Sequence, residues 1–145
     1  LASYRREEDK SILLDALSHY DNENEDVDMK DDETNNALLA VTVWACQDFV
    51  PLLMGIRDYE IKKHDSSMPP RSKYLFEAVM AYNNQWAYNF IDATLALSSK
   101  KKEREYDSYI TMATSFHSAM LSHYNPRFAS LLRKYPGKDF GDGYE

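Results

Sequence analysis

Residues 37–56 read ALLAVTVWACQDFVPLLMGI, and Asp48 is the single charged residue among them. At 100° per residue, the large apolar side chains of this stretch point to all sides of a helix, which is typical of a helix in the centre of a bundle. A membrane span is disfavoured, because Asp48 lies near the middle and a central Asp costs about 2.5–3.5 kcal/mol on insertion. We therefore expect a buried central helix over 35–63, with Pro51 as a kink or as the start of a second piece.

Helical spacing of apolar residues continues on both sides of this stretch. It predicts further helices over these ranges: 4–20, 72–97, 103–124 and 126–134. A loop with two prolines at 64–71 and the polar run SSKKKER at 98–104 separate them. The predicted fold class is all-α, a helical bundle of four to five helices. We expect one domain over 1–136 and a loose C-terminal tail over 137–145.

The predicted helix 72–97 carries two apolar stripes. The main stripe contains the following residues: Leu75, Val79, Tyr82, Trp86, Phe90, Ala93 and Leu97. A weaker stripe lies on the opposite side: Met80, Tyr88, Ile91 and Leu95. A surface helix of a monomer does not need a second stripe, so this helix is either packed between neighbours or carries an interface. In the second case the chain could form a homo-oligomer through it.

Residues 21–36, DNENEDVDMKDDETNN, contain eight acidic residues and one lysine. This segment therefore carries a net charge of −7, which equals that of the whole chain. Repulsion between like charges predicts an extended, solvated inter-helix segment. It is either a tether that keeps the protein soluble or an acidic arm for a basic partner. In the second case, Val27 and Met29 would act as small apolar anchors, and long-range attraction would speed association.

The first functional hypothesis is a non-enzymatic protein–protein interaction module, an adaptor that binds another protein with a basic surface. Its predicted partner-binding residues come from the acidic segment and from the weaker stripe: Glu23, Glu25, Asp26, Val27, Asp28, Met29, Asp31, Asp32, Tyr88, Ile91 and Leu95. Cys46 is the only cysteine, which favours an intracellular location, cytoplasmic or nuclear. Because the chain begins at Leu1 rather than Met, we expect a fragment or a processed product.

The alternative hypothesis is a small helical subunit of a nucleoprotein assembly. Four basic residues would contact nucleic acid: Lys100, Lys101, Lys102 and Arg104. Tyr106 and Tyr109 follow them, and basic residues interleaved with aromatic ones can hold phosphates and stack on bases. However, Glu103, Glu105 and Asp107 dilute this positive charge. The overall acidity of the chain also argues against a broad nucleic-acid footprint.

Catalytic motifs are scarce. The sequence contains no glycine-rich phosphate loop, no Gly-x-Ser-x-Gly motif and no Cys/His set with zinc spacing, so we expect no cofactor, no metal and no enzymatic activity. The pair His64-Asp65 is similar to the metal-binding His-Asp pair of the HD-domain phosphohydrolases, which are also all-helical. The resemblance covers these two residues and implies a metal-dependent phosphohydrolase as a minor alternative. The pair falls in the predicted loop, where a ligand pair has little rigid support.

Two single polar residues on apolar faces require an explanation. His117 lies on the inward face of the predicted helix 103–124. It is either a core histidine bonded to a backbone carbonyl or a tyrosine hydroxyl, or a proton-dependent switch. Asp48 needs a partner if it is buried, and Arg57 or a lysine from another helix could supply one. We expect this pairing to be structural.

Overall fold

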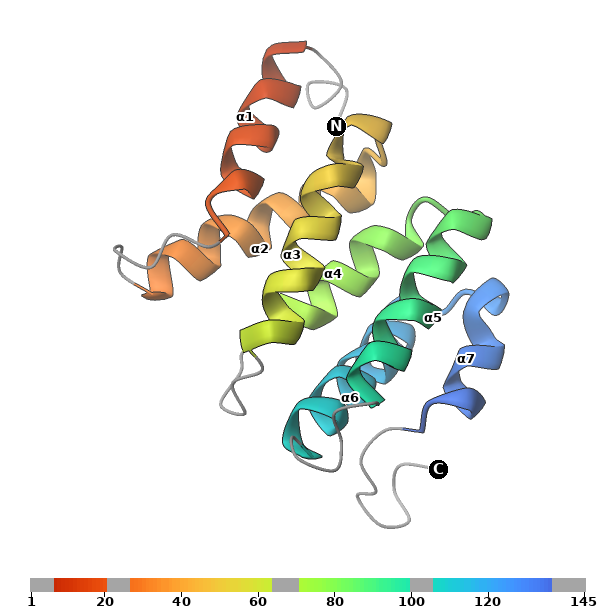
Figure 1. The fold of residues 1–145 in the computed structure, drawn as a ribbon. Coiled ribbons are helices and arrows are strands. Elements are labelled where there is room, and N and C mark those ends of the chain that lie inside the picture. The colour runs from red at the N-terminus through yellow and green to blue at the C-terminus, as the bar shows by residue number, and fades with distance from the viewer. Residues whose placement is uncertain (1–6, 21–26, 64–70, 100–105, 137–145) are drawn as a thin grey trace.

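Figure 1 shows the fold as a computed structural model, which describes residues 7–20, 27–63, 71–99 and 106–136. Every regular element within these residues is a helix, which confirms the all-α fold class. The described residues form seven α-helices rather than four or five, because two of the predicted helices are each divided in two. Their bounds are α1 (Glu7–Ser18), α2 (Val27–Val43), α3 (Val50–Lys63), α4 (Arg71–Met80), α5 (Gln85–Ser99), α6 (Tyr106–Ser122) and α7 (Ala129–Lys134). Two 3₁₀-helices, η2 (Gln47–Phe49) and η3 (Pro126–Phe128), precede α3 and α7.

The first division lies inside the predicted helix 35–63. Helix α2 ends at Val43, and the chain continues through η2 before α3 begins at Val50. Pro51 is the second residue of α3, where a missing backbone N–H leaves no intrahelical hydrogen bond unmade. Pro51 therefore belongs to the start of a second piece and not to a kink. At this break the carbonyl oxygen of Cys46 accepts hydrogen bonds from the Phe49 backbone N–H and from the Tyr82 hydroxyl.

The second division separates α4 from α5 and was not predicted. Asn83 has a φ of 52°, a left-handed conformation that asparagine adopts more readily than most residues. Asn84 then caps α5, because its side-chain oxygen accepts a hydrogen bond from the backbone N–H of Ala87 at 2.9 Å. The chain therefore turns here, and α5 does not continue the helical phase of α4.

The centre of the helix array is α4, not the predicted helix 35–63 (Figure 1). Helix α4 packs against α2, α3, α5 and α6. The six consecutive residues 75–80 are all buried, so this helix is covered on every side. Phe76 of α4 meets Phe116 of α6 edge to face, with 5.7 Å between the ring centroids.

Helix α1 packs across α2 and α3. Lys10 of α1 forms an ion pair with Asp48 at the start of η2, with 2.7 Å between the charged atoms. Asp48 thus receives its partner from a lysine of another helix, although its own side chain is half exposed. At the other end of α1, a Cβ atom added to Gly55 would lie 2.7 Å from the Tyr20 hydroxyl oxygen. Glycine at position 55 is therefore what allows this close approach.

None of the helices that the structure describes is both long enough and apolar enough to cross a lipid bilayer.

Candidate functional site

The acidic segment 21–36 is only partly what the sequence predicted. Residues 21–26, with Glu23, Glu25 and Asp26, lie outside the described residues. Residues 27–36 are not an extended inter-helix segment but the first turns of α2. Negative charge near a helix N-terminus is favoured by the helix dipole, which offsets part of the repulsion between the acids. Five predicted partner-binding residues lie in these turns: Val27, Asp28, Met29, Asp31 and Asp32.

These first turns of α2 lie at the outer edge of the helix array in Figure 1, where the helix is drawn in orange. The later turns of α2 enter the core, since Ala37, Leu38 and Val41 are buried. Asp15 of α1 is 72% exposed next to this end of α2. We call Asp15 together with segment 21–36 the acidic edge. Asp15 is exposed, and segment 21–36 carries a net charge of −7 in a chain whose other residues sum to zero.

A cluster of three side chains joins the two helices at the acidic edge. Asp15 lies in the last turn of α1, His19 directly follows the end of this helix, and Glu33 approaches from α2. The Nε2 atom of His19 lies 3.7 Å from Asp15 Oδ1, and its Nδ1 atom lies 3.4 Å from Glu33 Oε2. The Nδ1 atom is buried and makes no hydrogen bond. Sequence reasoning missed this cluster, because only the Asp15–His19 spacing is visible in the sequence.

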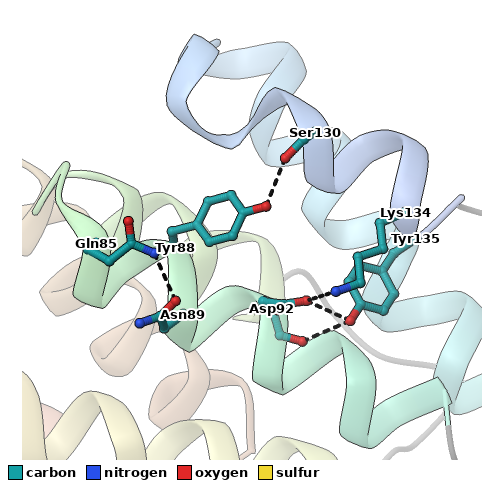
Figure 2. A network of polar contacts seen from close by, with 7 residues as sticks. All are labelled: Gln85, Tyr88, Asn89, Asp92, Ser130, Lys134 and Tyr135. Atoms are coloured by element: carbon teal, nitrogen blue, oxygen red, sulfur yellow. Dashed lines mark hydrogen bonds and ion pairs between the residues drawn. The ribbon is translucent and has the colours of Figure 1, made fainter.

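The weaker stripe of the predicted helix 72–97 is an internal packing face. Ile91 and Leu95 of α5 are fully buried, and Tyr88 is partly buried. Tyr88 stacks on Phe128, and its hydroxyl shares a 2.8 Å hydrogen bond with Ser130 of α7 (Figure 2). The weaker stripe was interpreted either as a face packed between neighbouring helices or as an interface. The structure shows the packed face. Ile91 and Leu95 are not available to a partner on this surface.

The residue that faces outward on α5 is Leu97, which the main stripe placed in the core. Leu97 is 44% exposed and Ala93 is exposed as well. Both lie in the later turns of α5, whereas Phe90 of the same stripe is buried. The predicted inner face therefore holds at Phe90 and fails at Ala93 and Leu97.

A polar network fastens α7 to α5 (Figure 2). Asp92 of α5 accepts a 2.7 Å hydrogen bond from the Tyr135 hydroxyl and lies 3.0 Å from Lys134 Nζ. The hydrogen bond from Tyr135, supported by Lys134, holds the pKa of Asp92 below its usual value. Burial, followed by the bond to Asp92, raises the pKa of Tyr135. These contacts are local and structural, and we call them the α7 clasp.

His117 adds to the same region. Its Nε2 atom lies 2.9 Å from the carbonyl oxygen of Tyr135. A carbonyl oxygen accepts, so Nε2 carries the proton in this contact. This geometry is the one expected of a core histidine bonded to a backbone carbonyl.

A pocket of about 300 Å³ lies where α2, α4 and the end of α6 meet. It is lined by Thr42, Glu77, Met80, Ala81, His123, Tyr124 and Asn125. The Glu77 carboxylate is almost completely buried there, 2.7 Å from Lys73 Nζ and 3.5 Å from His123 Nδ1. A buried carboxylate needs a compensating charge, and Lys73, one turn earlier on α4, provides it. The four-residue spacing of Lys73 and Glu77 is the sequence signal that could have identified this pair.

The remaining predicted residues lie outside the described residues: Lys100, Lys101, Lys102, Arg104, His64 and Asp65. The C-terminal tail 137–145 does as well. Two described basic residues of the C-terminal half make contacts within the protein. Arg127 donates from Nε to Asn83 Oδ1 at 3.2 Å, and Lys134 belongs to the α7 clasp.

The fold defines a class, an all-α protein, and its net negative charge is concentrated in residues 21–36 of the chain. No family model, no curated protein and no solved structure matches the chain. Its function must therefore be derived from the surface chemistry.

Proposed function

We propose that the protein is a non-enzymatic interaction module that binds a basic protein partner through the acidic edge. The observation that carries the proposal is that the acidic segment runs directly into the first turns of α2. Ten of its sixteen residues belong to α2. A helix fixes the spacing of its side chains, so less conformational entropy is lost on binding than with an extended chain.

The charge distribution supports this choice of partner. The acidic segment carries −7, and the rest of the chain therefore sums to zero. A localised negative patch attracts a basic surface over a distance of about one Debye length, about 8 Å at physiological salt. Such attraction raises the association rate and fixes the orientation of the partner. Binding should therefore weaken strongly as the salt concentration rises.

The nucleoprotein alternative has less support. The described C-terminal basic residues Arg127 and Lys134 already make contacts within the protein. A nucleic-acid surface needs several free cations together to release counterions from the phosphates. It would also have to overcome repulsion from the acidic edge.

The test is a paired pull-down at low and high salt with two charge-matched variants. In the first, Glu25, Asp28, Asp31 and Asp32 are changed to their amides. In the second, four acids elsewhere are changed in the same way: Glu103, Glu105, Asp139 and Asp142. Both variants have the same net charge, so only the position of the removed charge differs between them.

We expect the wild type and the second variant to hold the same basic partner at low salt and to release it at high salt. The first variant should fail to hold it, while keeping the helical circular dichroism of the wild type. Equal loss in both variants would indicate a general charge effect. Equal retention in both would show that the acidic edge is not the binding surface.

A further inference from the structure

We propose that Asp15, His19 and Glu33 form a binding site for a divalent transition-metal ion, of which Zn²⁺ is the representative, at the contact between α1 and α2. The three side chains each offer one ligand atom, and these atoms all lie within 4.8 Å of one another. One imidazole and two carboxylates are a common donor set for zinc and its neighbours in the first transition row. This proposal is independent of the protein partner proposed above.

The geometry between His19 and Glu33 is close to that of a bound metal. Metal–ligand bonds of about 2.0–2.2 Å in a tetrahedron place two ligand atoms roughly 3.3–3.6 Å apart. The distance from His19 Nδ1 to Glu33 Oε2 is 3.4 Å, within that range. The separation of these two atoms therefore already allows an ion to bridge them.

The state of the imidazole also points to a ligand. His19 Nδ1 is buried and makes no hydrogen bond, although the His19 side chain as a whole is 38% exposed. A buried polar atom without a hydrogen bond is destabilising, and it usually has a role or a partner. A metal ion at Nδ1 would satisfy this nitrogen and would neutralise the Glu33 carboxylate opposite it.

Asp15 completes the set from α1, the helix that ends just before His19. The two residues are four positions apart, and their side chains lie close together at the end of this helix. Asp15 is 72% exposed, so its side chain can rotate toward the ion without disturbing the core. Its carboxylate at present faces Nε2, the other ring nitrogen, at 3.7 Å. Water would fill the remaining coordination position on the exposed side.

The donor set predicts which ions bind. An imidazole ligand favours Zn²⁺, Ni²⁺ and Co²⁺ over Mg²⁺ and Ca²⁺, which prefer oxygen donors alone. A general attraction of cations to the acidic edge would show no such preference and would not depend on His19. Protons compete with the metal for the imidazole, so binding should weaken on acidification.

Isothermal titration calorimetry with Zn²⁺, on protein without an affinity tag, tests the site. We expect one saturable Zn²⁺ per chain in the wild type. The variants His19→Gln, Glu33→Gln and Asp15→Asn should each bind Zn²⁺ at least roughly tenfold more weakly. The control His123→Gln, which removes a histidine near α4 and α6, should bind as the wild type does. Co²⁺ should give visible absorption bands that are lost in His19→Gln.

A second measurement distinguishes loss of the metal site from loss of the fold. Zn²⁺ should raise the thermal unfolding temperature of the wild type and of His123→Gln, because the ion ties α1 to α2 in the folded state only. Mg²⁺ at the same concentration should raise it equally little in all variants. The proposal fails if Zn²⁺ affinity is unchanged in a folded His19→Gln protein, or if Mg²⁺ competes with Zn²⁺ on equal terms. Binding that is lost equally in His123→Gln would place the ion elsewhere.

Discussion

At the scale of single residues, Asn83 and Asn84 direct the path of the chain between α4 and α5. Asn83 takes the left-handed conformation, and its side chain accepts hydrogen bonds from Asn125 and Arg127. Asn84 supplies the cap of α5. Asparagine before a helix is a known start signal, so the break was in principle visible in the sequence. The apolar stripe that runs through this point concealed it.

Replacing Asn84 by alanine removes the cap and leaves the backbone N–H of Ala87 without its side-chain acceptor. We expect Asn84→Ala to lower the free energy of unfolding by about 1 kcal/mol, within the range of about 0.5–2 kcal/mol typical of lost caps. Urea unfolding followed by circular dichroism measures this. Asn84→Asp retains an acceptor oxygen and should unfold close to the wild type. An alanine variant as stable as the aspartate variant would contradict the capping role.

At the scale of elements, α7 is the helix that depends most visibly on a few polar contacts. It has six residues, which is too short for a stable helix in isolation. The α7 clasp and the stacking of Tyr88 on Phe128 attach it to α5. Sequence patterns located this helix, since Pro126 and the apolar pair Leu131 and Leu132 mark it. They could not identify Asp92 as its anchor, because Asp92 lies about 40 residues earlier in the chain.

The attachment of α7 should be lost in acid. The pKa of Asp92 is lower in the folded protein than the value of about 3.9 typical of an unfolded chain. The stabilisation is therefore complete above that value and disappears as the pH falls through the lower, folded pKa. We expect hydrogen-exchange protection factors of α7 amides to fall below about pH 4, before those of α4. In the Asp92→Asn variant, the α7 amides should be less protected from hydrogen exchange at neutral pH. Their protection should show no additional fall as the pH drops below about 4.

At the scale of the whole molecule, one continuous core joins the described helices. Its centre is α4, whose residues 75–80 are buried on all sides. The charge is distributed unevenly along the chain, since segment 21–36 carries −7 and the remaining residues sum to zero. The net negative charge is therefore concentrated in one segment of the chain.

Leu95 and Leu97 test the assignment of faces in this core. Both are leucines of α5, so the change in helix propensity on mutation to alanine is the same for both. Leu95 is fully buried and Leu97 is 44% exposed. We expect Leu95→Ala to lower the free energy of unfolding by about 2–5 kcal/mol and Leu97→Ala by less than half as much. Urea denaturation of both variants measures the difference, and the reverse order would support the stripe predicted from sequence.

The sequence by itself determined the all-α class, the approximate residue ranges of most helices and the position of the acidic segment along the chain. These follow from local properties: helical periodicity, residues that end helices, and the order of charges along the chain. Only the tertiary structure decided that α4 is central, that Leu95 rather than Leu97 faces inward, and that His19 meets Glu33. Periodicity shows that a helix has an apolar face, but it does not show which helix will cover that face. A single turn such as Asn83-Asn84 changes the helical phase, and contacts between distant segments form only when the helices pack.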